Sequence, residues 1–212
     1  MNDPRARNKV PEANTVSGYL TGYCEMLASA LRSVSSDRLE KAFQAIKEAS
    51  TRGAKIYVAG NGGSSAIASH LCCDWMKGTH IKGKKALKVH SLTENVSLLT
   101  ALANDFGYEH CLSEQIEILC QPGDLVILIS SSGNSTNIVK AAETARGKKA
   151  TLISLTGFKG GAVSQMADIS LHVPVENYGI AEDAHQVLMH VLAQFLYLSS
   201  KQKINDSLNA LA

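Results

Sequence analysis

The sequence has few aromatic residues, no long apolar run and almost no excess charge. Aromatic side chains make up 5% of its 212 residues, so we expect a core built mainly from Leu, Ile, Val and Ala. No apolar run approaches the ~20 residues that cross a bilayer, which argues against a membrane protein. Residues 1–14 are polar and carry charges of both signs, which is not the pattern of a secretory signal.

The balance of charge argues against nucleic acid as a partner. Lys and Arg number 21 against 19 Asp and Glu, and a net charge of +2 does not favour a broad basic face.

The cysteines indicate the redox state of the protein. They number five, which is odd, and the adjacent Cys72 and Cys73 lack the spacing of a metal motif. We therefore expect reduced thiols in a cytoplasmic protein. With 45% hydrophobic and 19% charged residues, the composition is that of a folded globular chain.

Two helices are predicted before any strand. Apolar residues recur at three- and four-residue intervals through residues 19–34, and the period resumes at Leu39 and runs to Gly53. The apolar faces of these two helices cannot be buried against each other alone. We therefore expect residues 15–53 either to cover the sheet or to form an oligomer interface, after a polar tail at residues 1–14.

From residue 55 onward, short apolar or β-rich runs alternate with segments of helical period. The strands are predicted at residues 55–59, 87–91, 125–130, 151–155 and 169–173. The helices are predicted at residues 64–76, 94–103, 108–119, 134–145 and 181–199. This alternation predicts an α/β fold in three layers, with a doubly wound, mostly parallel sheet between helices. No linker divides the chain, so we expect one domain with an N-terminal helical extension.

A glycine-rich loop follows the first predicted strand. Residues 60–65 read Gly-Asn-Gly-Gly-Ser-Ser, and ligands of open parallel sheets bind at such carboxyl ends of strands. The glycines allow a ligand to approach the backbone, and the next helix begins with free N–H groups. A plain strand-to-helix turn is the alternative. The dinucleotide fingerprint is excluded because position 65 is Ser where that motif requires Gly.

A serine-rich loop follows the third predicted strand. Residues 130–135 read Ser-Ser-Ser-Gly-Asn-Ser and precede a predicted helix. Hydroxyls, free N–H groups and the helix dipole together favour a phosphate monoester. The loop contains no Lys or Arg, which favours a small phosphate over a triphosphate with magnesium. The alternative is a serine-rich turn that caps the helix.

Two predicted helices each carry a histidine and an acid. His70 and Asp74 are four residues apart, and Glu182 and His190 are eight apart, so each pair shares one helix face. Two imidazoles and two carboxylates form a nitrogen and oxygen ligand set that suits zinc. A solvated face with scattered charges is the alternative that spacing alone leaves open.

Taken in order, these motifs resemble the SIS (sugar isomerase) domain, and within it the phosphoheptose isomerases, also called sedoheptulose 7-phosphate isomerases. The resemblance spans residues 19–197 and rests on residues 60–64, His70, 104–108, 130–135, 155–157 and 160–161. It implies a flavodoxin-like five-stranded parallel sheet at residues 54–200, followed by a C-terminal tail at 201–212. It also implies a cytoplasmic homotetramer with the N-terminal helices in its interface and active sites shared between subunits.

The resemblance implies roles for individual residues. One zinc ion for each active site would be held by His70, Asp74, Glu182 and His190. Substrate contacts are implied for Asn61, Gly62, Gly63, Ser64, Asp74, Asn104, Asp105, Ser130, Ser131, Ser132, Ser135 and Glu182. Ser131 stands where the family has Thr.

Four further positions depart from the family pattern. Asp74 replaces a Glu that is both ligand and base, and Glu182 replaces a Gln ligand. Aspartate is one methylene shorter, and ~1 Å of misplacement can cost roughly a hundredfold in rate. The extra charge of Glu182 would strengthen metal binding and reduce Lewis acidity. Ile180 and Gly78 each stand where the family has Arg, which favours an altered substrate pocket.

The implied reaction is the aldose–ketose isomerisation of sedoheptulose 7-phosphate to D-glycero-D-manno-heptose 7-phosphate, which supplies heptose for lipopolysaccharide or capsule. Asp74 would be the base and His190 its acid/base partner, since the reaction moves a proton between neighbouring carbons. Isomerisation of another ketose phosphate is one alternative. The other is a non-catalytic SIS regulator of replication initiation, although those regulators lack the second zinc histidine, here His190.

Overall fold

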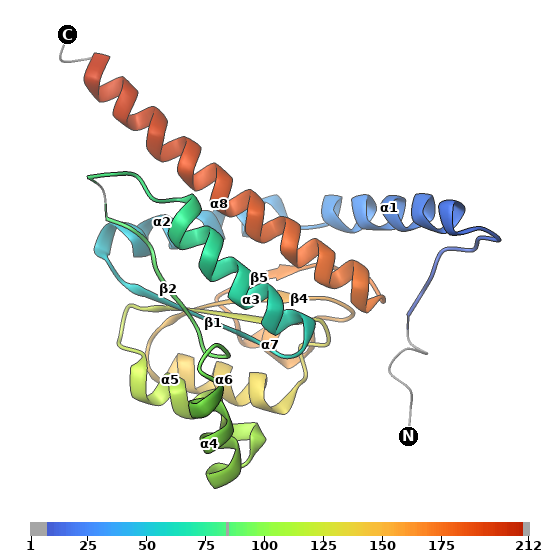
Figure 1. Ribbon diagram of the computed structural model, residues 1–212, viewed down its shortest axis with the longest axis horizontal. Coiled ribbons are helices and arrows are strands. Elements are labelled where there is room, and N and C mark those ends of the chain that lie inside the picture. Colours follow the sequence, from blue (N-terminus) through green and yellow to red (C-terminus); the bar gives the residue numbers. More distant parts are fainter. Residues whose placement is uncertain (1–7, 84, 210–212) are drawn as a thin grey trace.

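A single parallel sheet organises the protein, whose computed structural model describes residues 8–83 and 85–209 (Figure 1). Its strands are β1 (Lys55–Gly60), β2 (Lys88–Ser91), β3 (Leu125–Ser130), β4 (Thr151–Thr156) and β5 (Ile169–His172). They lie in the order β2-β1-β3-β4-β5, and every neighbouring pair is parallel. The predicted strands are confirmed to within two residues at each end.

Helices cover both faces of the sheet and complete the predicted three-layer α/β fold (Figure 1). One face carries α2 (Ser36–Arg52), α3 (Gly63–Cys73) and α8 (Tyr178–Asn209), which share a single apolar cluster with the strands. The other face carries α4 (Val96–Phe106), α5 (Ser113–Leu119), α6 (Thr136–Gly147) and α7 (Gly161–Met166). None of the described helices is both long and apolar enough to cross a membrane.

The central strand β3 shows why both faces must be covered. Leu125, Ile127 and Ile129 point into the cluster under α2, α3 and α8, whereas Val126 and Leu128 point into the opposite cluster. All are buried, because side chains alternate between faces at every residue of a strand. The continuous apolar run that predicted this strand is therefore typical of a sheet covered on both sides.

The two N-terminal helices have different roles. α2 covers the sheet and buries Ala42, Phe43, Ile46 and Ala49. By contrast, α1 (Val16–Arg32) buries only Ala30 and contacts α8. It leaves Val16 and Leu20 exposed, and it extends away from the body of the protein (Figure 1).

Several helix boundaries differ from the sequence predictions. The helix expected at residues 108–119 divides into a 3-10 turn at Tyr108–His110 and α5. The short helix α7 was not predicted. α8 continues to Asn209, so residues 201–209 extend this helix where a tail was expected. Of the expected N-terminal tail, residues 1–7 lie outside the described part of the chain. Lys9 donates a backbone hydrogen bond to the Glu176 carbonyl.

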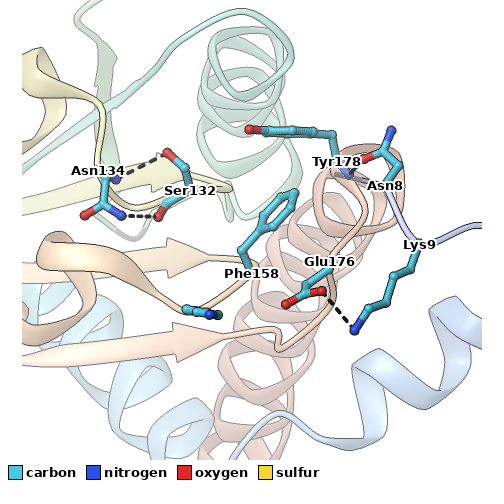
Figure 2. Close-up of a pocket in the computed structure, with 8 residues that line it drawn as sticks. Asn8, Lys9, Ser132, Asn134, Phe158, Glu176 and Tyr178 are labelled. Atoms are coloured by element: carbon cyan, nitrogen blue, oxygen red, sulfur yellow. Dashed lines mark hydrogen bonds and ion pairs between the residues drawn. The ribbon is translucent and has the colours of Figure 1, made fainter. Parts of the chain in front are cut away.

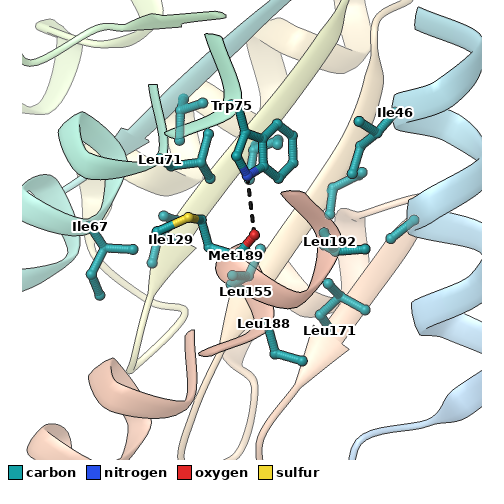
Figure 3. Close-up of a cluster of buried hydrophobic side chains, with 14 of the residues drawn as sticks. Ile46, Ile67, Leu71, Trp75, Ile129, Leu155, Leu171, Leu188, Met189 and Leu192 are labelled. Carbon is teal, nitrogen blue, oxygen red and sulfur yellow. Dashed lines mark hydrogen bonds between the residues drawn. The ribbon is translucent and has the colours of Figure 1, made fainter. Parts of the chain in front are cut away.

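The helix predicted at residues 64–76 changes geometry at a functional candidate. After α3 ends at Cys73, the chain forms a π-helical turn, η2 (Asp74–Gly78). Single π turns within α-helices occur frequently at functional sites. Here the turn places Trp75 in the core, where its side chain is 1% exposed and its Nε1–H donates to the Met189 carbonyl at 3.2 Å (Figure 3).

Trp75 fastens η2 to α8, and this contact can be tested by substitution. We expect Trp75→Phe to lower the free energy of unfolding by about 2 kcal/mol, because it removes a buried hydrogen bond and part of a packed ring. The neighbouring Met76 is exposed, so Met76→Ala should change the free energy of unfolding by less than about 0.5 kcal/mol. Denaturant unfolding at one protein concentration measures both. Equal stability of the two variants would contradict this role for Trp75.

Candidate active site

Two histidines and an aspartate meet where α3 and η2 pack against α8. His190 Nε2 lies 3.1 Å from Asp74 Oδ2, and His70 Nε2 lies 3.4 Å from the same oxygen. The two rings stand edge to face with centroids 5.1 Å apart. Each of the three residues offers a ligand atom within 4.8 Å of the others. We call His70, Asp74 and His190 the two-helix group.

The core positions the two-helix group. Asp74 and Trp75 are neighbours, as are Met189 and His190, so the buried Trp75–Met189 hydrogen bond lies directly behind the polar contact of Asp74 with His190. His70 is one turn before Asp74 on the same face. The side chains of the group remain partly exposed, and a cavity of about 420 Å³ opens beside Asp74 and His190.

Glu182, the fourth predicted ligand, lies outside this group. Its carboxylate packs against the backbone at Gly63, so closely that a methyl group there would collide with it. Burial and the nearby charge of Asp183 raise the pKa of the Glu182 carboxyl. The structure therefore brings three of the four predicted ligands together and places Glu182 at the start of α3.

The side chain that does reach the group is Gln186, which the sequence analysis missed. Its Nε2 lies 2.8 Å from His70 Nδ1 and 3.3 Å from His190 Nε2. Gln186 is one turn from Glu182 and one turn from His190 on the same face of α8. The four-residue spacing was a signal for it, but a half-buried glutamine on a helix is too common to single out.

The glycine-rich loop is fastened to the start of α6. Asn61 Nδ2 donates to Asn137 Oδ1 at 2.8 Å, and Asn137 Nδ2 donates back to Asn61 Oδ1 at 2.9 Å. Tyr108 donates its hydroxyl to the same Asn61 oxygen. Gly62 has a φ of +54° and is the N-cap of α3, which begins at Gly63. Asn61, Tyr108, Ser135 and Asn137 line a cavity of about 540 Å³ between the two loops.

The serine-rich loop leads into the N-terminus of α6 and carries four serine hydroxyls. Ser130 and Ser131 are buried, and Ser131 Oγ has no hydrogen-bond partner among the described residues. Ser132 Oγ accepts from Asn134 N. Ser135 is the N-cap of α6, but its hydroxyl makes no capping hydrogen bond. Neutral donors at a helix N-terminus suit a phosphate group.

Among the described residues, no hydrogen bond joins the predicted pair Asn104 and Asp105 to either loop. Asn104 Nδ2 donates to Asp105 Oδ1 at 2.8 Å, and both side chains are exposed at the end of α4. Phe106 and Tyr108 beside them are also exposed. Within the part of the chain that the structure describes, the pair is not brought to the two-helix group.

A third cavity, of about 580 Å³, is lined by Ser132 and Asn134 of the serine-rich loop. Figure 2 shows Ser132 and Asn134 on one side of it, Lys9, Glu176 and Tyr178 on the other, and Phe158 between them. Lys9 Nζ pairs with Glu176 Oε2 at 2.9 Å. No sequence signal pointed to this cavity, because residues from four separate segments form it.

His185 lies on α8 beside Gln186 but takes no part in the group. It is fully buried, and burial lowers the pKa of its imidazole to about 4, so the ring is neutral at pH 7. Its place in the interior is that of a packing residue.

Comparison with known proteins identifies the class. Residues 21–157 match the family model of the SIS domain. The phosphoheptose isomerase of Citrifermentans bemidjiense is 34% identical over 181 residues, covering 85% of this chain and 93% of the relative. That of Aliarcobacter butzleri is 38% identical over 158 residues, covering 74% of this chain and 83% of the relative. The fold, the two loops and these matches together show that the chain is an SIS-domain protein.

Solved structures agree with that class. A phosphoheptose isomerase from Francisella tularensis matches with a TM-score of 0.80 and 27% identity, over 86% of this chain and 96% of that one. Phosphoheptose isomerase GmhA from Neisseria gonorrhoeae matches with a TM-score of 0.78 and 28% identity, over 85% and 96%. The chain belongs to the phosphoheptose isomerase family, whose members are aldose–ketose isomerases.

At Gly133, the backbone of the serine-rich loop packs closely against the backbone at Gly160. A substitution at Gly133 tests this packing. Gly133 has a φ of +64°, and a methyl group there would strike the Gly160 carbonyl. We expect Gly133→Ala to destabilise the protein by about 3 kcal/mol or more. Gly147 ends α6 with no atom near its missing Cβ, so Gly147→Ala should cost nothing. Thermal unfolding compares the two, and a harmless Gly133→Ala would refute the tight packing of this loop.

Proposed function

We propose that the protein converts sedoheptulose 7-phosphate to D-glycero-D-manno-heptose 7-phosphate, a step that supplies heptose for lipopolysaccharide or capsule. One observation carries the proposal: the acid–base group includes His70 of α3, the helix that begins in the glycine-rich loop, and Glu182 of α8 packs against Gly63 at the start of that helix. The names of the relatives support this substrate.

The chemistry requires a proton to leave the carbon beside the carbonyl and return to its neighbour. Asp74 is the base in this proposal, and His190 exchanges protons with the sugar oxygens. Their 3.1 Å contact allows a proton to pass between them. Asp74 is shorter than glutamate, so the substrate must approach the two-helix group closely.

Zinc fits the donors present in the two-helix group. Two imidazoles and a carboxylate whose ligand atoms lie within 4.8 Å are the donor types that zinc takes in catalytic sites. His70, Asp74 and His190 would hold the ion. When bound, it would supply polarisation of the substrate carbonyl and hydroxyl.

The loops bind the remainder of the substrate. Hydroxyls of Ser130, Ser131, Ser132 and Ser135 and the start of α6 hold the phosphate, and the loop at residues 61–64 holds the sugar. Binding energy from the distant phosphate orients the reacting carbons. A neutral cradle suits a single phosphate group.

We also propose a cytoplasmic homotetramer with shared active sites. Exposed apolar side chains on α1 and α8 support an interface, among them Val16, Leu20, Phe195 and Leu198. In such a tetramer, the exposed Asn104 and Asp105 would line the substrate site of another subunit.

One observation favours a second candidate, an isomerase of another ketose phosphate. The resemblance implies two arginines at positions 180 and 78. Ile180 is fully buried, and a Cβ added at Gly78 would meet no atom within 4 Å. Without these cations, substrate recognition at this end of the sugar relies on neutral contacts and Lys77, which lines the cavity beside the two-helix group.

Turnover tests the proposal directly. We expect sedoheptulose 7-phosphate incubated with the protein and zinc to give an aldoheptose 7-phosphate, and a chelator to abolish the conversion. Phosphorus or proton NMR follows both sugars. Failure of the folded, zinc-loaded protein would contradict the proposed substrate, and conversion of another ketose phosphate would favour the second candidate.

His190→Ala tests the assigned acid–base partner. We expect the turnover number to fall by about 10²–10⁴-fold, the usual contribution of a positioned acid–base residue, with the fold preserved. His80 is exposed and outside the two-helix group, so His80→Ala serves as the matched control. Near-normal turnover by His190→Ala would show that the assignment is wrong.

A further inference from the structure

The third cavity, of about 580 Å³ beside the serine-rich loop, carries cations that the loop itself lacks. We propose that this cavity receives the phosphate group of a sugar phosphate, with Lys159 and Lys9 as the cations that bind it and Glu176 as the carboxylate that competes for them. The inference rests on the proposed function, because the sugar phosphate is taken to be the substrate. It assigns residues that would bind one end of that substrate.

The charges of the third cavity favour an anion. Lys9 Nζ pairs with Glu176 Oε2 at 2.9 Å (Figure 2). The hydrogen bond and charge of Lys9, with a smaller contribution from the charge of Lys159, hold the pKa of the Glu176 carboxyl below its usual value. The described residues that line the cavity include two ammonium groups and one carboxylate, which leaves one positive charge.

The serine-rich loop adds neutral groups to the same cavity. Ser132 and Asn134 line it, and Asn134 Oδ1 accepts a hydrogen bond from Ala162 N at 2.9 Å, which holds the loop in place. Ser132 Oγ accepts from Asn134 N, so its own hydroxyl proton can be donated to a ligand. A phosphate monoester accepts several hydrogen bonds at once, and those from ammonium groups are the stronger ones.

Backbone hydrogen bonds position Lys9 at this cavity. Lys9 N donates to the Glu176 carbonyl at 2.7 Å, and Asn177 Nδ2 donates to the Lys9 carbonyl at 2.9 Å. Tyr178 N donates to Asn8 Oδ1 at 3.0 Å. The backbone of Lys9 is therefore fixed against the start of α8, whereas its side chain is 73% exposed. The ammonium group can thus turn from the carboxylate to an incoming anion.

The turn that carries Lys159 has an unusual backbone conformation. The preceding residue, Phe158, has a φ of +45°, in the left-handed region that bulky residues rarely adopt. Its N–H donates to the Val175 carbonyl at 3.0 Å, and its ring packs against Tyr178 with centroids 4.6 Å apart. Such strained conformations cluster at ligand-binding sites. Here the turn places Lys159 in the lining of the cavity, and the two rings offer an apolar surface to the carbons of a sugar.

Calorimetric titration with glucitol 6-phosphate tests the site without turnover, because this ligand has a phosphate group but no carbonyl to isomerise. The full-length parent is compared with Lys159→Gln, Lys9→Gln and Glu176→Gln. The matched control is Lys41→Gln, which removes an exposed lysine that also pairs with a carboxylate at 2.9 Å, that of Asp37. Unphosphorylated glucitol is the control ligand, and thermal unfolding checks that each variant is folded.

We expect Lys159→Gln to bind glucitol 6-phosphate about 5–10-fold more weakly, because it loses a charge-assisted contact. Lys9→Gln should weaken binding by about 2–3-fold, since an exposed lysine contributes less. Glu176→Gln should strengthen binding by about 2–3-fold, because it removes the carboxylate that competes for both lysines. Lys41→Gln should bind like the parent, and no variant should change the binding of glucitol.

The opposite signs separate ligand binding from a structural role. If the Lys9–Glu176 pair only held the N-terminal segment in place, both of its variants would weaken binding. The inference is overturned by that result, by a Lys159→Gln variant that binds like the parent, or by a parent that does not bind glucitol 6-phosphate.

Turnover kinetics identify the source of the phosphate group. If the cavity binds the substrate, Lys159→Gln raises the KM for sedoheptulose 7-phosphate by the factor seen in calorimetry and leaves kcat unchanged, as loss of uniform binding requires. An unchanged KM beside weaker binding of glucitol 6-phosphate would assign the cavity to a separate phosphorylated ligand and contradict its role in substrate binding.

Failure of this inference is distinguishable from failure of the proposed function. If the variants change binding as expected but the parent does not convert sedoheptulose 7-phosphate, the phosphate site stands and the substrate proposal fails. If the parent converts the sugar while every variant binds glucitol 6-phosphate alike, the phosphate site fails and the function stands.

Discussion

The packing of η2 against α8 is the constraint on which the candidate active site depends. Trp75 is buried in the core with its indole N–H on the Met189 carbonyl, and this pair lies directly behind Asp74 and His190 (Figure 3). A ring in a close-packed core fits one arrangement, so the helices cannot slide without losing packing. The same apolar interaction that stabilises the fold therefore sets the 3.1 Å contact between an acid and a base.

The topology of the sheet supplies the second half of the site. β1 and β3 are neighbours, so the glycine-rich and serine-rich loops leave the same edge side by side. The paired amides of Asn61 and Asn137 join the two loops, while the close approach at Gly133 holds the second against the segment before α7. In the proposed function, phosphate binding at this edge and proton transfer between Asp74 and His190 would act on two ends of one sugar.

Much of this arrangement could be predicted from the sequence, because it depends on local patterns. Buried strands are apolar runs, and the two loops follow them directly. His70 and Asp74 are found from helical spacing. The π turn was not predictable, since it depends on how Trp75 packs against a helix over a hundred residues away. Gln186 was missed for a related reason: spacing shows which residues share a face of α8, but only the fold shows which of them reaches His70.

The central claim is that the two-helix group is the metal-binding reaction centre. Anomalous diffraction at the zinc absorption edge, from crystals grown with zinc, tests it most directly. The account predicts one strong peak for each chain, within about 2.0–2.2 Å of donor atoms of His70, Asp74 and His190. A zinc peak elsewhere in the chain, or none between α3 and α8 in protein that zinc activates, would contradict it.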